Sequence, residues 1–103
     1  LSLELGGKNP NIIFDDADFR ECVATSVRSS FSNQGEICLC GSRIFVQSTV
    51  YDKFVREFVE AARKWKVGDP SDPNTMVGAL ISREHLAKVS SYVELAKQEG
   101  FFL

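Results

Sequence analysis

The sequence lacks features that mark membrane, secreted and nucleic-acid-binding proteins. Its longest apolar runs are only a few residues, against the roughly 20 needed to cross a bilayer, and nothing in it resembles a signal peptide. Lys and Arg number 12 against 14 Asp and Glu, for a net charge of -2, so it has no basic field for binding phosphates. We expect a cytoplasmic protein that binds neither membrane nor nucleic acid.

Glycine motifs that cradle nucleotide phosphates are also missing. No G-x-G-x-x-G stands between a predicted strand and a predicted helix, and no G-x-x-x-x-G-K-[ST] occurs anywhere in the 103 residues. If the protein uses a nucleotide, we expect the residues that hold its phosphates to lie outside this sequence.

Cysteine and histidine are scarce. The three cysteines, Cys22, Cys38 and Cys40, are an odd number that cannot pair completely, which favours a reducing compartment over a secreted disulfide framework. Cys38 and Cys40 are spaced like two metal ligands, but zinc takes about four, and the one histidine, His85, is remote in sequence. We therefore expect free thiols and no metal site.

Strand and helix patterns alternate along the chain. Short apolar runs predict strands, and capping residues followed by apolar stripes predict helices. The predicted strands are 1–5, 11–14 and 43–47, and the predicted helices begin after Asp18, Thr49 and Ser82 and end near 33–35, 68–70 and Gly100. The apolar stripe of the last helix is Leu86, Val89, Val93 and Ala96. This order indicates an α/β fold with a largely parallel sheet flanked by helices.

Both ends of the sequence are unusual for an autonomous domain. The sequence opens inside the first predicted strand without an initiator methionine, and it closes on the apolar residues 101–103 directly after Gly100. We therefore expect a piece of a longer protein.

Two polar, glycine-containing segments interrupt the hydrophobic pattern. They are residues 3–10, L-E-L-G-G-K-N-P, and residues 33–43, N-Q-G-E-I-C-L-C-G-S-R. Each joins a predicted element to a turn, where α/β enzymes expose catalytic groups because the scaffold is rigid and the loop backbone can approach a ligand. In the first segment the leucines would share one face of a strand, and Glu4 would lie partly buried on the other.

These segments resemble the two signature motifs of the aldehyde dehydrogenase superfamily, L-E-L-G-G-K with its glutamate and N-Q-G-x-x-C with its cysteine. Glu4 and Cys38 are separated by 38 - 4 = 34 positions, the spacing that the family keeps. Two motifs at a fixed long spacing are much harder to meet by chance than one short pattern. The resemblance implies that residues 1–103 are part of the thiol-bearing catalytic domain, and that 1–7 end a strand of the preceding cofactor-binding domain.

The resemblance implies a catalytic role for each motif. Cys38 would attack an aldehyde, because the planar carbonyl must become tetrahedral before it can lose a hydride, and a thiolate is a strong nucleophile. The backbone N–H of Cys38 and an asparagine upstream of this sequence would stabilise the oxyanion. After the hydride has passed to NAD, or to NADP, Glu4 would act as the general base that activates water to hydrolyse the thioester.

The resemblance also implies cofactor contacts, a substrate and an assembly. The backbone of Leu5, Gly6 and Gly7 would pass close to the nicotinamide, and His85 and Lys88, one helical turn apart, would approach the cofactor ribose. A solvent-facing helix surface explains His85 and Lys88 equally well. Residues 9–14, N-P-N-I-I-F, and residues 36–40, E-I-C-L-C, look most like the muconic semialdehyde dehydrogenase branch, including the 2-aminomuconic and hydroxymuconic enzymes, which implies a small semialdehyde substrate. Betaine aldehyde dehydrogenases and other broad-specificity members have similar residues there. Relatives are usually homodimers or homotetramers.

Other interpretations of the same residues stay open. A lone cysteine is more often a small buried hydrophobe than a nucleophile, which is our interpretation of Cys22 and Cys40, and a strand glutamate such as Glu4 often faces solvent. Cys38 could form a thioester without any cofactor, as in a hydrolase. A third hypothesis is a catalytically silent fragment whose apolar faces serve assembly.

Overall fold

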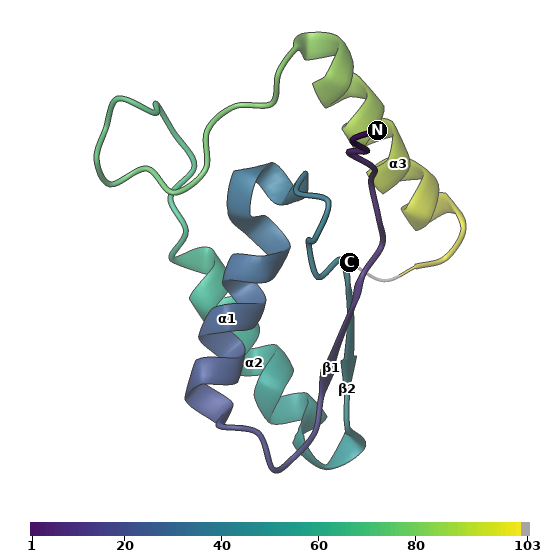
Figure 1. Cartoon of the computed structure of the whole chain (residues 1–103). Helices are drawn as coiled ribbons and strands as arrows, with labels where there is room; N and C mark the ends of the chain where they lie inside the picture. The colour runs from purple at the N-terminus through teal and green to yellow at the C-terminus, as the bar shows by residue number, and fades with distance from the viewer. Residues whose placement is uncertain (102–103) are drawn as a thin grey trace.

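The computed structural model of this chain describes residues 1–101. Its elements follow one another in the order β1 (Pro10–Ile13), α1 (Phe19–Phe31), β2 (Arg43–Val46), α2 (Tyr51–Arg63) and α3 (Arg83–Gln98), with 3-10 turns at Ser32–Gly35 and Ser48–Val50 (Figure 1). The predicted alternation of strands and helices is confirmed from residue 10 onward. Of the apolar end predicted at 101–103, residues 102–103 lie outside the described part of the chain.

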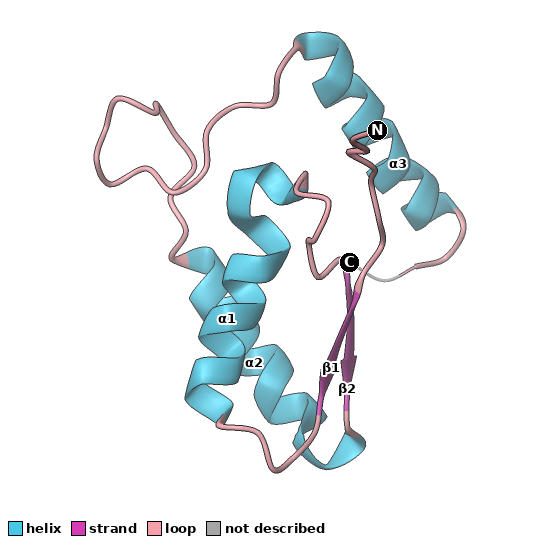
Figure 2. Cartoon of the chain, in the orientation of Figure 1, coloured by secondary structure: helices cyan, strands magenta, loops and turns pink. Residues whose placement is uncertain are grey.

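β1 and β2 form a two-stranded parallel sheet in which Pro10 pairs with Arg43 and Ile13 pairs with Val46. Parallel strands need a crossover connection, and α1 with the loop after it provides one. α1 and α2 lie side by side and pack against the sheet (Figure 2). The predicted fold class, α/β with parallel strands flanked by helices, is confirmed.

The core lies between the sheet and these two helices. Ile13 of β1, Val23 of α1 and Phe54 of α2 are only 3%, 7% and 2% exposed, and removing such apolar surface from water is the main stabilising term in folding. α1 begins where the capping pattern predicts, because the Asp18 carboxylate accepts a hydrogen bond from the Glu21 N–H at 3.2 Å. The packed helices and strands therefore provide a rigid base for the loops between them.

The strand predicted at 1–5 is wrong for this structure. Residues 1–9 form neither strand nor helix, and the leucines expected to share a face are all exposed. A strand needs a neighbour for its backbone hydrogen bonds, and β2 pairs with the chain only from Pro10 onward. The assignment of 1–7 to a preceding cofactor-binding domain stays a prediction.

The predicted start of α2 is also wrong in its detail. Val50 occupies the N-cap position and makes no side-chain capping bond. The Thr49 hydroxyl, expected to cap the helix, donates instead to the Asp15 carboxylate at 3.0 Å. Asp15 also accepts a hydrogen bond from the Gln47 side-chain amide at 2.8 Å, so these polar side chains join the turn after β1 to the turn after β2.

α3 begins and ends as predicted but does not bury its apolar stripe. Ser82 caps the helix by accepting from the His85 N–H at 3.1 Å, and Gly100 ends it in the left-handed region with φ of 84°. The expected core stripe is largely open, with exposed fractions of 54% for Leu86, 41% for Val89 and 40% for Val93. Figure 1 shows the reason, because α3 stands apart from the α1–α2 layer.

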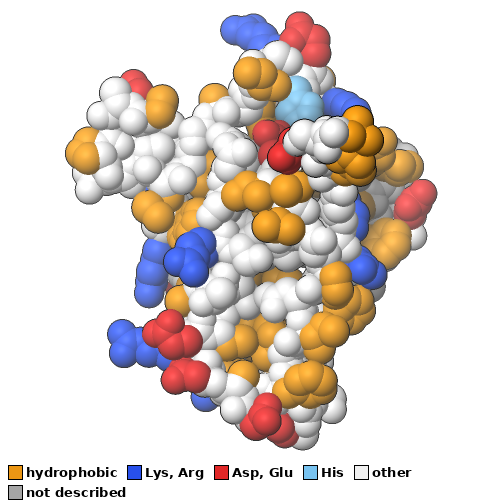
Figure 3. Space-filling model, viewed as in Figure 1, with side chains coloured by type: hydrophobic (Ala, Val, Ile, Leu, Met, Phe, Trp, Pro, Cys, Tyr) orange, Lys and Arg blue, Asp and Glu red, His pale blue; other side chains and the backbone are white. Residues whose placement is uncertain are grey.

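The surface carries a large share of apolar side chains. On the strands and just after them, Ile12, Phe14 and Phe45 are 60%, 61% and 51% exposed, and Figure 3 shows apolar side chains reaching the visible face. Ile12 and Phe45 are paired across the two strands, so their exposed side chains are neighbours. None of the helices in residues 1–101 has the length and apolar character required to span a membrane.

Candidate active site

The segment after α1 turns sharply before it reaches Cys38. Asn33, Gln34 and Gly35 have φ angles of 48°, 59° and 76°, and this left-handed conformation costs a non-glycine residue about 1–2 kcal/mol. A Cβ on Gly35 would lie only 2.9 Å from the Ser30 carbonyl oxygen. Backbone strain of this kind concentrates at functional sites. Here it redirects the chain from α1 into the turn of residues 37–40, which we call the cysteine turn.

Cys38 lies exposed in this turn, whereas Cys40 is buried. The Cys40 N–H donates to the Ile37 carbonyl at 2.9 Å and closes the turn, and Cys40 is 5% exposed. All three cysteines are free, and Cys22 packs against the core. The interpretation of Cys22 and Cys40 as packing residues is confirmed. Cys38 is the one cysteine with an exposed side chain.

We expect Cys38 to be alkylated first when the native protein reacts with iodoacetamide. Iodoacetamide reacts with thiolates that it can reach, and a buried thiol must first be exposed by local opening of the structure. Cys38 should therefore react on the order of tenfold or more faster than buried Cys40, with half-buried Cys22 between them. Peptide mass spectrometry over a time course measures the three rates. Equal rates at Cys38 and Cys22 would favour the catalytically silent fragment.

The two predicted motifs meet at the cysteine turn. The side-chain amide of Asn9 donates to the Cys38 carbonyl at 2.7 Å and to the Cys40 carbonyl at 3.1 Å. A Cβ on Gly7 would lie 3.2 Å from the Cys38 carbonyl oxygen, so the two segments are in contact. Glu4 is exposed, which corrects the expectation of a partly buried carboxylate, because the strand predicted around it does not form.

The start of α3 also contacts the cysteine segment. His85 Nε2 lies 2.8 Å from a Glu36 carboxylate oxygen, and the Gln34 side-chain amide donates to the Ala79 carbonyl at 3.2 Å. The predicted cofactor residue His85 is therefore beside the candidate site. Lys88, one turn later, has an exposed side chain.

Three residues that link the site were not singled out from the sequence. Glu36 and Gln34 are polar side chains inside the cysteine motif and Asn9 directly follows the glutamate motif, and these positions are the signal that could have identified them. Their partners lie 29, 49 and 45 positions away in the chain. The local periodicity of a sequence cannot predict contacts between residues this far apart in the chain.

A fixed negative charge lies at the start of α3. The Glu84 carboxylate accepts hydrogen bonds from the Glu84 backbone N–H and from the Ser82 hydroxyl, and these bonds hold the pKa of Glu84 below its ordinary value. The carboxylate thus stays ionised at neutral pH, where it is favourable at a helix N-terminus. Within residues 1–101, no three His, Cys, Asp or Glu side chains gather as a metal site would require.

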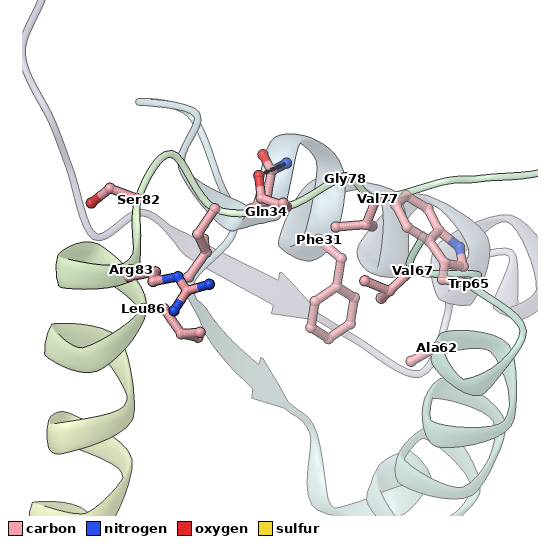
Figure 4. Close-up of a pocket in the computed structure, with 12 residues that line it drawn as sticks. Phe31, Gln34, Ala62, Trp65, Val67, Val77, Gly78, Ser82, Arg83 and Leu86 are labelled. Atoms are coloured by element: carbon pink, nitrogen blue, oxygen red, sulfur yellow. Dashed lines mark hydrogen bonds between the residues drawn. The ribbon is translucent and has the colours of Figure 1, made fainter. Parts of the chain in front are cut away.

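An apolar hollow of about 770 Å³ lies next to the cysteine segment. Figure 4 shows Phe31 and Trp65 on the α1–α2 side of it and Leu86 on the α3 side, with Gln34 between them. Neither Cys38 nor the glutamate segment lines this hollow. It separates α3 from the α1–α2 layer and is distinct from the candidate active site.

The comparisons with known proteins establish the class of the chain. The model of the aldehyde dehydrogenase family matches residues 1–103. The chain therefore belongs to the aldehyde dehydrogenase family, and the resemblance inferred from its two motifs is confirmed.

Individual relatives narrow the similarity within the family. The 2-aminomuconic semialdehyde dehydrogenase of Bos taurus is 66% identical over 97% of this chain and 20% of its own length. The 5-carboxymethyl-2-hydroxymuconate semialdehyde dehydrogenase of Escherichia coli is 52% identical over 96% of this chain and 21% of its own length. The predicted similarity to muconic semialdehyde dehydrogenases is thus confirmed, and this chain spans about a fifth of the length of these relatives.

Solved structures give the same fold. The crystal structure of betaine aldehyde dehydrogenase from Staphylococcus aureus in complex with NAD+ matches this chain with a TM-score of 0.90 and 46% sequence identity, and the match covers 94% of this chain and 19% of that one. The segment described here therefore adopts the conformation it has within a much longer relative.

Proposed function

We propose that this chain carries the nucleophile and the general base of an NAD(P)-dependent enzyme that oxidises a small semialdehyde to its carboxylic acid. The observation that carries the proposal is the contact of the two motifs, in which the Asn9 amide joins the segment of Glu4 to the turn of exposed Cys38. This contact between segments far apart in sequence supports a thiol and a carboxylate that act on one substrate. By full-length enzyme we mean a protein of the relatives' length that contains this chain.

Cys38 carries the first step of the proposed reaction. Its thiolate sulfur adds to the carbonyl carbon, which forms a C–S bond and leaves the negative charge on oxygen. Among residues 1–101 the Cys38 N–H donates to no acceptor, so it is available to the oxyanion. When the tetrahedral adduct loses its hydride, the C=O bond forms again and a thioester remains on Cys38.

Glu4 carries the second step. Its carboxylate takes a proton from water while the water oxygen attacks the thioester carbon. The C–S bond then breaks, which releases the carboxylic acid and returns the thiolate. The exposed position of Glu4 supports this role, because the carboxylate is open to the water that it must activate.

Open space beside Gly6 supports the cofactor role predicted for its segment. A Cβ on Gly6 would meet no atom within 4 Å, whereas a Cβ on Gly7 would lie 3.2 Å from the Cys38 carbonyl oxygen, so the backbone is open at Gly6 and supported by the cysteine turn at Gly7. We propose the backbone of Leu5, Gly6 and Gly7 for the nicotinamide, and His85 and Lys88 for the ribose. NAD, or NADP, supplies when bound the acceptor for the hydride.

The names of the relatives support the substrate class. Two of them are dehydrogenases of muconic semialdehydes, so we propose a small semialdehyde as the substrate of the full-length enzyme. We also propose a cytoplasmic enzyme, which the three free thiols support, that assembles as a homodimer or homotetramer.

NADH formation tests this function. The full-length enzyme should form NADH when 2-aminomuconic or hydroxymuconic semialdehyde and NAD are supplied together, and the isolated 103-residue chain should form none. An activated ester without NAD tests the alternative. Cys38-dependent ester cleavage together with no NADH from any aldehyde would favour a cofactor-independent hydrolase, and inactivity in both assays would favour an assembly module.

A further inference from the structure

The geometry points to Asn9 as a positioning residue, whose side-chain amide fixes the turn that carries Cys38 and couples it to the segment that carries Glu4. This inference rests on the proposed function and adds a residue outside the catalytic pair. It concerns how the thiol is aimed, and not the chemistry that the thiol performs.

Both N–H bonds of the Asn9 amide are used on one turn. They reach the carbonyl oxygens of Cys38 and Cys40 at 2.7 and 3.1 Å, and both distances are within the range of good hydrogen bonds. An amide that bridges two carbonyl groups of one turn fixes the direction of both peptide planes. The direction of the Cys38 carbonyl sets a backbone dihedral angle of Cys38. The hydrogen bond from Asn9 to this carbonyl therefore also fixes where the thiol and the N–H of Cys38 point.

The other hydrogen bonds of this loop either join residues on the two sides of Cys38, as the Cys40 N–H does with the Ile37 carbonyl, or lie further along the chain. The Gly41 N–H donates to the Ser29 carbonyl at 3.3 Å and the Ser30 hydroxyl donates to the Gly41 carbonyl at 3.1 Å, so α1 holds the exit of the turn. Within the described residues, the bond from Asn9 is the one hydrogen bond that the Cys38 backbone makes. Without it, the Cys38 backbone would make no hydrogen bond within the described residues, and the bond from the Cys40 N–H to the Ile37 carbonyl would remain to close the turn.

Asn9 itself is held firmly. Its carbonyl accepts from the Arg43 N–H at 3.3 Å, and the Arg43 side chain donates through Nε to the Lys8 carbonyl at 3.0 Å. The next residue, Pro10, is the first of β1 and restricts Asn9 to extended conformations. The amide therefore projects from the rigid start of the sheet, which is what a residue that positions a catalytic group requires.

The chain offers a matched control two residues away. The Asn11 side-chain amide donates to the Ser26 hydroxyl at 2.8 Å. If Asn11 became aspartate, the hydroxyl could donate to the new carboxylate, whereas the carbonyl groups of Cys38 and Cys40 can only accept. The same substitution should therefore be tolerated at Asn11 and should repel the turn at Asn9.

The test compares Asn9→Asp with Asn11→Asp in the full-length enzyme. Asn9→Asp should lower kcat and the rate of Cys38 alkylation by about 10–100-fold with KM unchanged, and Asn11→Asp should change both rates by less than about threefold. The ratio of the Asn9→Asp alkylation rate to that of the unmodified enzyme should rise as pH falls towards about 5, because a protonated carboxyl group can donate to one of the carbonyls. A residue that only stabilised the fold would not give this pH dependence.

Asn9→Ala removes the donors without adding charge and should lower both rates by about 5–20-fold, so it carries the test if Asn9→Asp does not fold. Either folded variant with both rates within about twofold of the unmodified enzyme, alongside an inactive Cys38→Ala, would overturn the role of Asn9 and leave the proposed function intact. An equal loss in Asn11→Asp would also overturn it. An active Cys38→Ala would overturn the proposed function itself.

Discussion

Cys38→Ala should lower NADH formation by the full-length enzyme by roughly 10⁴-fold or more. Alanine removes the sulfur that makes the carbonyl carbon tetrahedral, and a planar aldehyde has no comparable route to hydride loss. The neighbouring thiol cannot take over, because Cys40 is 5% exposed and faces the protein interior. Initial rates of NADH fluorescence at saturating aldehyde and NAD measure the loss.

Cys22→Ala is the matched control for this substitution. Cys22 packs against the core formed by Ile13, Val23 and Phe54, so its removal should change stability more than catalysis, and initial rates should stay close to those of the unmodified enzyme. If Cys38→Ala formed NADH as fast as the unmodified enzyme, the nucleophile would be another group. A similar loss in both variants would indicate that folding, and not chemistry, had been affected.

Glu4→Gln should separate the two chemical steps. Its steady-state turnover should fall by about 10²–10⁴-fold, the usual contribution of a general base, because glutamine cannot take a proton from the attacking water. The first step needs only the thiol, so one NADH per active site should still appear rapidly before the slow phase. Stopped-flow measurement of this burst and of the following steady state checks both parts.

Glu57→Gln, on the exposed surface of α2, makes the same change of charge away from the site and should leave both phases unchanged. A Glu4→Gln enzyme with normal steady-state turnover would exclude Glu4 as the base. A complete loss of the burst would instead place Glu4 in the step at Cys38.

Local chemistry made the helices and most strands predictable from the sequence. Asp18 and Ser82 cap the helices that they were expected to cap, and Gly100 ends α3 in the left-handed conformation. Each of these capping and termination signals depends on a few neighbouring residues, so it can be recognised from the local sequence alone. The β-branched runs 11–14 and 43–47 likewise predicted the two strands that pair.

Features that depend on distant partners were not predictable in the same way. The alternating leucines around Glu4 favour a strand, but the structure gives that segment no paired neighbour, so its backbone stays irregular. The exposure of Leu86 has the same cause, since an amphipathic pattern does not say whether a partner covers it. The contact of His85 with Glu36 joins residues 49 positions apart, and only the fold brings them together.

The two catalytic candidates came from a family resemblance together with chemical reasoning. Spacing alone gives 34 positions between Glu4 and Cys38 and says nothing about their distance in space. The structure adds the physical link, in which Asn9 and Gly7 hold the glutamate segment against the cysteine turn. It also shows that the thiol at Cys38 is accessible while that at Cys40 is not.

Mass spectrometry of acid-quenched Glu4→Gln enzyme, after reaction with aldehyde and NAD, tests most directly whether Cys38 and Glu4 act one after the other on the same carbon atom. We expect the peptide containing Cys38 to gain the mass of the aldehyde less two hydrogen atoms, as a thioester, and this adduct to persist far longer than in the unmodified enzyme. An adduct on a different residue, or an adduct at Cys38 that disappears equally fast in both enzymes, would contradict it.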